Sequence, residues 1–147
     1  MAISIICNFT DMKQIKVEIS WEDKNYCCGW GYPGFGAVLA TSKRIENVKM
    51  EFEEAVRSQV SEMVAAGEQV DKWLENGEYE FSYSLAVSAL LRQAEQFTTM
   101  AVISRMTGIN QKLLSHYASS VKIPRRAQRD RIVAGLHDIG RHFMSVE

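Results

Sequence analysis

The sequence lacks any long apolar run, and this absence excludes several classes of protein. Its apolar stretches are short, as in Ala2–Cys7, and none approaches the roughly eighteen residues needed to span a bilayer. The first eight residues also lack a basic start, a long apolar segment and a cleavage site, so they do not resemble a secretory signal. We therefore expect a cytoplasmic protein without a membrane partner.

Cysteine and histidine are also scarce, with three of each in 147 residues. All three cysteines lie in the first fifth of the chain, and two are adjacent, so their side chains diverge and are not easily bridged. The histidines lie far from them, which leaves no zinc-binding spacing. We expect no disulfide framework, no metal site and no cofactor. The residues concerned are Cys7, Cys27, Cys28, His116, His137 and His142.

The charged residues are distributed unevenly along the chain. Residues 1–97 hold nine Lys and Arg against fifteen Asp and Glu, whereas residues 98–147 hold eight against three. The overall formal net charge of −1 conceals this difference. A concentration of positive charge favours an anionic partner such as nucleic acid. The sequence therefore predicts nucleic-acid binding for the C-terminal part only.

Alternation of apolar and polar residues predicts a small sheet in the first half of the chain. The alternation is strict in the first strand, as expected when one face of a strand is buried. Polar or glycine-containing turns separate the first three strands, and Asn76-Gly77 precedes the fourth. The predicted strands are residues 13–21, 26–32, 36–41 and 79–84.

Helical periodicity accounts for the rest of the sequence. Apolar residues recur every three or four positions from Ile45 to Gly67, with Thr41-Ser42 as the expected cap, and a short helical stretch follows around Val70–Leu74. Beyond the fourth strand no strand pattern returns. We expect an α+β fold, with a β-β-β-α-β sheet domain in residues 1–84 and an all-α domain in residues 85–147. The predicted helices of the second domain are residues 85–96, 99–106, 110–119 and 125–146.

The segment Met100–Tyr117 has the spacing of a helix-turn-helix. Ser104 provides a small residue where two helices cross, and Gly108 provides a turn position that suits positive φ. Ile103, Ile109, Leu114 and Tyr117 are placed to lock the two helices together. The second helix then exposes side chains that are able to bind base edges or phosphates in a major groove. These candidate DNA-binding residues are Asn110, Gln111, Lys112, Ser115 and His116.

A run of basic residues follows this motif directly. Such a run is suited to contacts with the phosphate backbone, which fix the position of a protein on DNA. Lys122, Arg125 and Arg126 are the candidates nearest the motif, and the run continues to Arg129 and Arg131. Together with the second helix, the run predicts sequence-specific binding to duplex DNA.

The chain resembles the HicB-type antitoxins over residues 12–146. In the second half the resemblance is carried by SYSLAVSALL and by TGINQKLLSHYASSVKIPRRAQRDRIVAGLHDIGRHF, which are similar to repressor-like DNA-binding domains. In the first half KQIKVEISWEDKNYCCGW, PGFGAVLAT and TSKRIENV occur in the order of a partial RNase-H-like sheet domain. The chain departs from the pattern at Ala101, where repressors often have Gln, and at Ser120, where Gly is usual. Residues 1–11 lie outside the resemblance.

The resemblance implies both a function and partners. The N-terminal domain would bind a small RNase toxin of the HicA kind, and the C-terminal domain would bind operator DNA of its own operon as a homodimer or higher oligomer. A stand-alone transcriptional regulator, with a sensing or oligomerisation domain in place of toxin binding, is the alternative. The candidates Asn110, Gln111, Lys112, Ser115 and His116 would face the major groove, and Lys122, Arg125 and Arg126 would lie near phosphates.

Catalysis by the sheet domain is not expected. RNase-H chemistry needs several carboxylates that converge on two metal ions. The first strand offers only Glu18, on its solvent-facing side, and nothing pairs Glu78 or Glu80 with an acidic residue of that strand. His137 and His142 are five residues apart, so they lie on different faces of a helix. The sequence therefore predicts a protein that is not an enzyme and has no catalytic residues.

The last helix carries a narrow apolar seam. Ile132, Leu136, Ile139 and Phe143 repeat at alternating four- and three-residue spacing, which suits either a domain core or a partner helix. The first two are expected in the core, and the end of the helix, with Phe143 and Met144, is expected to form a dimer contact, since two half-sites require two copies.

Overall fold

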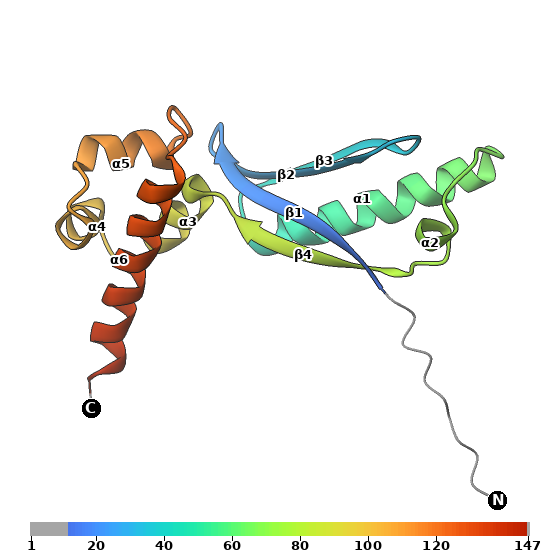
Figure 1. Ribbon diagram of the computed structural model, residues 1–147. Helices are drawn as coiled ribbons and strands as arrows, with labels where there is room; N and C mark the ends of the chain where they lie inside the picture. The colour runs from blue at the N-terminus through green and yellow to red at the C-terminus, as the bar shows by residue number, and fades with distance from the viewer. Residues whose placement is uncertain (1–11, 147) are drawn as a thin grey trace, which may run out of the picture.

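The computed structural model describes residues 12–146, and its fold is α+β, as predicted (Figure 1). Cys7 and the rest of the extra segment 1–11 lie outside the described residues. No described helix is long and apolar enough to cross a membrane. The strands are β1 (Lys13–Glu22), β2 (Asn25–Tyr32), β3 (Gly36–Ser42) and β4 (Tyr79–Leu85). The helices are α1 (Ile45–Ala65), α2 (Lys72–Glu75), α3 (Val87–Ala94), α4 (Met100–Thr107), α5 (Gln111–Ala118) and α6 (Arg126–Met144).

The four strands form one mixed sheet in the order β3-β2-β1-β4. β1 pairs antiparallel with β2 and parallel with β4, from Lys13 opposite Tyr79 to Ile19 opposite Leu85. The strict alternation of β1 directs Ile15, Val17 and Ile19 to one face, where each is at most 3% exposed. That face is buried, and the residues between them are exposed, so the other face of β1 is open to solvent.

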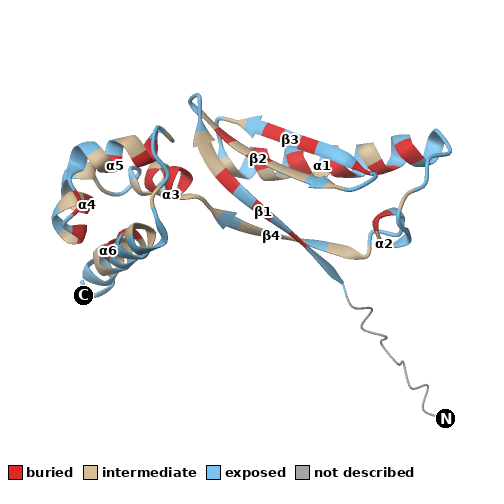
Figure 2. Ribbon diagram, turned by 45° about the horizontal axis from the view of Figure 1, so that its top comes forward, coloured by how far each residue is buried: buried red, intermediate tan, exposed pale blue. Residues whose placement is uncertain are grey.

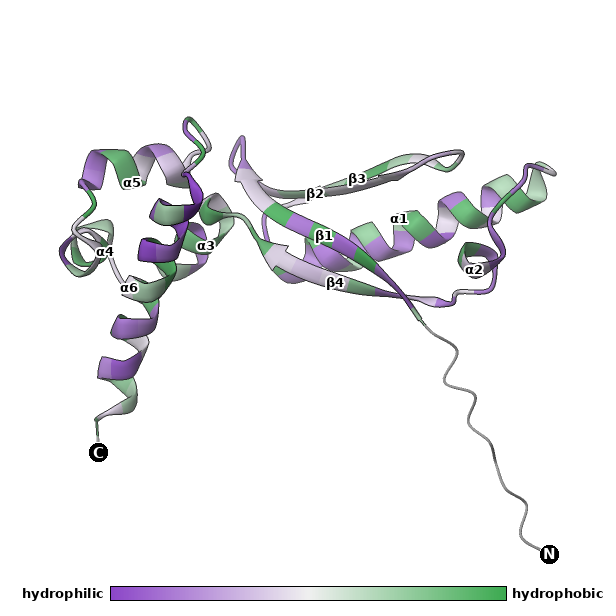
Figure 3. Cartoon of the chain, in the orientation of Figure 1, coloured by the Kyte–Doolittle hydropathy of each residue, from purple (hydrophilic) through white to green (hydrophobic). Residues whose placement is uncertain are grey.

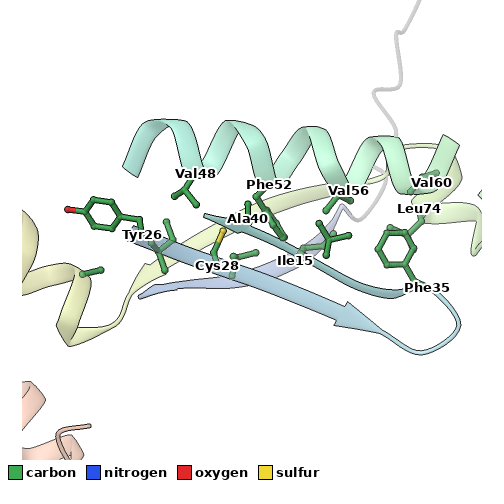
Figure 4. Packing of buried hydrophobic residues seen from close by; sticks show 14 of the residues in the cluster. Ile15, Tyr26, Cys28, Phe35, Ala40, Val48, Phe52, Val56, Val60 and Leu74 are labelled. Atoms are coloured by element: carbon green, nitrogen blue, oxygen red, sulfur yellow. The ribbon is translucent and has the colours of Figure 1, made fainter. Parts of the chain in front are cut away.

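Helix α1 covers the buried face of the sheet (Figure 4). Phe52 is fully buried and its ring meets that of Phe81 at 5.6 Å. The helix begins at Ile45, and its N-cap Arg44 makes no side-chain capping bond. The expected cap at Thr41-Ser42 is therefore wrong, because both residues continue β3 in register with β2. The residues that α1 buries are Val48, Phe52, Val56, Val60 and Met63.

Two hydrophobic clusters form, one for each half of the chain. We call β1–β4 with α1 and α2 the sheet unit, and α3–α6 the helical unit. Helix α3 serves both clusters, since Ala89 packs in the cluster of the sheet unit whereas Val87 and Leu91 pack in that of the helical unit. The helix begins two residues later than predicted because Leu85 completes β4. The buried core of the helical unit is Val87, Leu91, Ile103, Ile109, Leu114, Tyr117, Ala118 and Ile132.

The two units are joined by polar contacts around Trp21, at the end of β1. The Trp21 backbone N–H donates to Ser88 Oγ at 2.9 Å, and Ser120 Oγ donates to the Trp21 carbonyl at 2.7 Å. The Arg92 guanidinium lies 4.4 Å from the centroid of the Trp21 ring, a cation–π geometry. Ser120 has φ +60°, a left-handed conformation that glycine adopts more readily than serine. A single tryptophan thus links β1 to α3 and to the loop after α5.

Candidate nucleic-acid interface

A tight turn joins α4 to α5. Helix α4 ends at Gly108, whose φ is +69°, and the Gly108 N–H donates to the Ser104 carbonyl at 2.8 Å. Ser104 Oγ donates to the Ile109 carbonyl at 2.7 Å, and the Ile109 N–H donates to Thr107 Oγ1 at 3.2 Å. These bonds satisfy polar groups that the short helices leave open, so the angle between α4 and α5 is fixed by side chains as well as by packing.

Helix α6 packs closely against the end of α4, next to this turn, at Gly135. A Cβ atom at Gly135 would lie 2.5 Å from Thr107 Cγ2, so the two helices approach too closely for any side chain there. Thr107 is buried, and the hydrogen bond that its hydroxyl donates to the Ile103 carbonyl at 2.7 Å holds its side chain in this position. The close packing of α6 against Thr107 therefore restrains the end of α4, where the turn begins.

Two of the basic residues expected to contact phosphate have structural roles instead. Arg131 Nη2 donates to the Thr107 carbonyl at 2.8 Å, at the C-terminal end of α4, and Arg129 Nη2 donates to the Leu85 carbonyl at 2.9 Å. Both guanidinium groups satisfy carbonyls at the ends of secondary structure. The expectation that the whole basic run contacts phosphate is therefore corrected. Arg129 joins the two units, and Arg131 holds the turn.

The start of α5 presents free polar side chains. Asn110 is the N-cap, and its Oδ1 accepts from the Lys112 N–H at 2.8 Å. One acceptor position of that oxygen is therefore used within the helix, and the amide nitrogen of Asn110 makes no capping bond. Gln111 and Lys112 follow on the first turn and are both exposed. The hydrophobic residues before and after this segment, Ile109 and Leu114, are buried in the core of the helical unit.

The second turn of α5 contributes less to this surface. Ser115 is exposed, but its hydroxyl donates to the Gln111 carbonyl at 3.0 Å, one turn earlier. His116 is half-buried, and its carbonyl accepts from the Lys122 N–H at 3.2 Å. The five candidates of α5 thus fall into a free pair, Gln111 and Lys112, and three residues that are partly engaged or partly covered.

The remaining candidates lie just after the far end of α5. Arg125 and Arg126 are exposed at the start of α6, and Lys122 is exposed in the connecting loop. Helix α5 is eight residues, or about 12 Å, long, and the loop of residues 119–125 follows it before α6 begins. No ion pair between described residues involves Lys112, Lys122 or these two arginines. The positive charge at both ends of α5 is therefore available to an external anion.

An acidic cleft borders this surface on the side of the sheet unit. The cleft has a volume of about 430 Å³ and lies between the β1–β2 turn and the loop after α5. Glu18, Glu22 and Asp23 line one wall, and Lys122 lines the other. Because these carboxylates repel phosphate, Lys122 is less favourably placed for DNA than Arg125 and Arg126. Neither the cleft nor the junction at Trp21 follows from any local sequence pattern.

The carboxylates of the sheet do not converge. Glu18 and Glu80 are both exposed and lie on different strands, where Glu18 is paired with Ser84 and Glu80 with Gln14. Glu80 accepts a hydrogen bond from Gln14 Nε2 at 2.9 Å. Within residues 12–146, no group of three or more His, Cys, Asp and Glu side chains is arranged to hold a metal ion. His137 and His142 are both exposed on α6.

The two described cysteines have the character of unreactive thiols. Cys28 is 5% exposed in the core, and its burial, aided by the neighbouring Cys27, raises the pKa of its thiol to about 11. Burial also raises the pKa of Cys27, on the open face of the sheet, and Glu22 adds to that effect. Both thiols are protonated near neutral pH, so neither is an activated nucleophile.

Comparison with known proteins identifies no relative of this chain. No family model, no curated protein and no solved structure matches the chain.

Proposed function

We propose that α4 and α5 form a helix-turn-helix and that the protein is a sequence-specific DNA-binding repressor. One observation carries the proposal: α5 exposes Gln111 and Lys112 at its start, on a turn that Ser104, Thr107 and Arg131 hold rigidly. The first residues of a recognition helix are those that reach base edges in the major groove. Glutamine pairs with adenine and lysine with guanine, so both side chains suit base recognition.

Arg125 and Arg126 have a different role in this proposal. They lie beyond the far end of α5, where a side chain meets the phosphate backbone but no base edge. Contacts of that kind increase affinity for every sequence and make binding depend on salt. The other candidates belong to the edge of the proposed contact with DNA. They are Asn110, Ser115, His116 and Lys122.

For the whole chain we propose an antitoxin of the HicB type, with a sheet domain in residues 1–84 and a DNA-binding domain in residues 85–147. The sheet domain carries the excess of acidic residues, and one face of its central strand is uncovered. A small RNase must bind RNA and so presents a basic surface, to which an acidic domain is complementary. The proposed action is to bind and occlude such a toxin, without catalysis by this chain.

A stand-alone regulator is the second candidate function. The junction at Trp21 favours it specifically, because the hydrogen bonds that join Trp21 to Ser88 and to Ser120 would transmit a change in the sheet unit to the DNA-binding unit. Copurification with the product of a short neighbouring reading frame distinguishes the two. A stable complex that abolishes RNA cleavage by the partner supports the antitoxin, and a neighbour that neither binds nor cleaves RNA supports the regulator.

The DNA-binding proposal is tested by fluorescence anisotropy on the upstream promoter duplex at several salt concentrations. Gln111→Ala or Lys112→Ala should weaken binding by about 1–3 kcal/mol on the promoter and by less on random duplex. The double variant Arg125→Ala, Arg126→Ala should weaken both duplexes alike and reduce the salt slope. Arg44→Ala, which removes an exposed arginine of the sheet unit, is the matched control. Unchanged affinity in all variants would show that the helix pair is only structural.

A further inference from the structure

The carboxylates of the acidic cleft are not paired with any cation of the described chain. Glu18 lies on the open face of β1, and Glu22 and Asp23 lie at the turn between β1 and β2. No ion pair between described residues involves any of the three, although Lys122 lines the opposite wall. Three carboxylates and one ammonium group give the lining of the cleft a formal charge of −2. The cleft is therefore suited to a cationic ligand.

The cleft is formed by segments that are far apart in the chain. Figures 1 and 2 both show the β1–β2 turn beside the loop after α5, and Figure 2 shows the turn in pale blue, as exposed. Figure 3 shows the same turn in purple, as hydrophilic. Its volume of about 430 Å³ is in the range of small-molecule sites and far exceeds that of a single ion.

Tyr117 gives independent evidence for a ligand in this cleft. Its side chain is 6% exposed, yet its hydroxyl makes no hydrogen bond to another described residue, unlike the hydroxyls of Tyr26 and Tyr83. Within residues 12–146 only Arg92 Nε is both sealed from solvent and unpartnered, so the Tyr117 hydroxyl opens on the cleft that its side chain lines. A tyrosine buried so deeply usually has a partner for its hydroxyl. Here that partner has to come from outside the chain.

The arrangement of the carboxylates indicates what kind of cation fits. They do not converge on one point, because no three His, Cys, Asp or Glu side chains of the described chain are arranged to hold a metal ion. A divalent metal ion needs several oxygen ligands in direct contact with it. Two positive charges that are set apart on a flexible chain reach carboxylates on different segments and need no such convergence.

We propose that the acidic cleft binds a linear aliphatic diamine. Its two ammonium groups pair with the carboxylates and donate to the free hydroxyl oxygen of Tyr117. Ser119 and Ser120 also line the cleft, and both hydroxyls donate to backbone carbonyls, so each oxygen is able to accept from an ammonium group. Ile123 and Pro124 provide apolar surface in the same cleft for the methylene chain between the two charges.

Calorimetric titration of the full chain tests the proposal without DNA, with putrescine as the diamine, at low and constant ionic strength. Putrescine should bind at one site per chain, and butylamine, which has the single charge of a lysine side chain, should bind at least about tenfold more weakly. Glu18→Gln and Glu22→Gln should each weaken putrescine binding by about threefold to tenfold. Glu80→Gln is the matched control, because Glu80 is an exposed carboxylate of the same sheet outside the cleft.

Tyr117→Phe separates a binding role of the hydroxyl from a structural one. The variant retains the buried ring and removes an oxygen that has no partner in the described chain. It should weaken putrescine binding by about threefold or more and leave the thermal denaturation midpoint unchanged. Three results would overturn the proposal: no binding of putrescine, equal binding of butylamine, or a loss in Glu80→Gln as large as in Glu18→Gln.

A consequence for DNA rests on the proposed function. A bound diamine offsets the carboxylates that repel phosphate beside Lys122, so putrescine should raise affinity for the promoter duplex at constant ionic strength. The double variant Glu18→Gln, Glu22→Gln should abolish this increase. Putrescine binding by a chain that does not bind DNA would support the cleft and refute the repressor. DNA binding without putrescine binding would refute the cleft and support the repressor.

Discussion

The sheet unit and the helical unit stabilise their helices in different ways. In the sheet unit, α1 is 21 residues long, has no side-chain cap and buries five apolar residues against the sheet. In the helical unit, α4 and α5 are eight residues each, and their N-caps Thr99 and Asn110 both accept a backbone hydrogen bond. Helices this short are unstable alone, so caps contribute a larger share of their stability.

The units also differ in how they use charge. Three of the ion pairs between described residues lie in the sheet unit, and two, Arg92–Glu95 and Asp138–Arg141, lie in the helical unit but outside α4 and α5. The cations around α5 either satisfy backbone carbonyls, as Arg129 and Arg131 do, or have no carboxylate partner in the described chain, as for Arg125 and Arg126. A basic composition therefore overstates the number of residues that are free to bind nucleic acid.

The largest expected effect concerns the dependence of the sheet unit on packing. Phe52→Ala should lower the free energy of unfolding by about 3–5 kcal/mol, because it removes a fully buried ring and leaves a cavity. Leu39→Ala is the control on the same sheet, since Leu39 is 78% exposed, and should change stability by less than about 0.5 kcal/mol. Urea denaturation followed by circular dichroism measures both. Equal effects would show that the sheet unit does not depend on the core assigned to it.

The two glycines of α6 give the next effect, with opposite signs. Gly135→Ala should destabilise the chain by about 1–3 kcal/mol, because its methyl group overlaps Thr107 Cγ2. Gly140→Ala should stabilise it by up to about 1 kcal/mol, because alanine favours the helix and meets nothing. Thermal denaturation of both variants beside the wild type, at one low protein concentration, is the measurement. Two changes of the same sign would contradict the assigned contact between α4 and α6.

A smaller effect separates the two kinds of arginine. Arg131→Ala should lower the free energy of unfolding by about 1–2 kcal/mol, because the Thr107 carbonyl loses a charged donor. Arg126→Ala should change it by less than about 0.5 kcal/mol, because no side-chain bond of Arg126 stabilises the fold. Denaturation of both variants beside the wild type is the measurement. If Arg126→Ala proves as destabilising as Arg131→Ala, Arg126 is not free for phosphate.

The smallest effect near neutral pH is expected at Cys28. Burial raises the pKa of its thiol to about 11, well above that of an exposed thiol, so the fold favours the protonated form. This contribution is complete below the unfolded pKa and is lost as pH rises toward 11. Between pH 9 and 11 the wild type should lose more stability than Cys28→Ala, and both should be insensitive to this group at pH 7. Denaturation at each pH gives the free energy of unfolding of both proteins. Because both contain the same tyrosines, the difference between the two free energies does not include tyrosine ionisation.

The sequence predicted much of the candidate site, but it did not predict which of its residues are free. The periodicity of residues 100–117 predicted both helices and the turn at Gly108, and the turn is observed there. Composition alone gave no means of separating Arg131 from Arg126, because the carbonyl that binds Arg131 lies 24 residues away in the chain. The same holds for Phe97, which lines an apolar groove together with Leu136, Ile139 and Phe143, although the apolar seam predicted from the sequence lies within α6 alone.

The sequence by itself determined the local structure of this protein. Alternation in β1, three- and four-residue spacing in α1, and the positive-φ position at Gly108 act over a few residues, so periodicity and backbone preference predict them directly. The tertiary structure decided what depends on distant contacts. It placed β4 parallel to β1, linked Trp21 to Ser88 and Ser120, and gave Gly135 a neighbour while leaving Gly140 without one. Such contacts join residues far apart in the chain, and no local pattern encodes which of them meet.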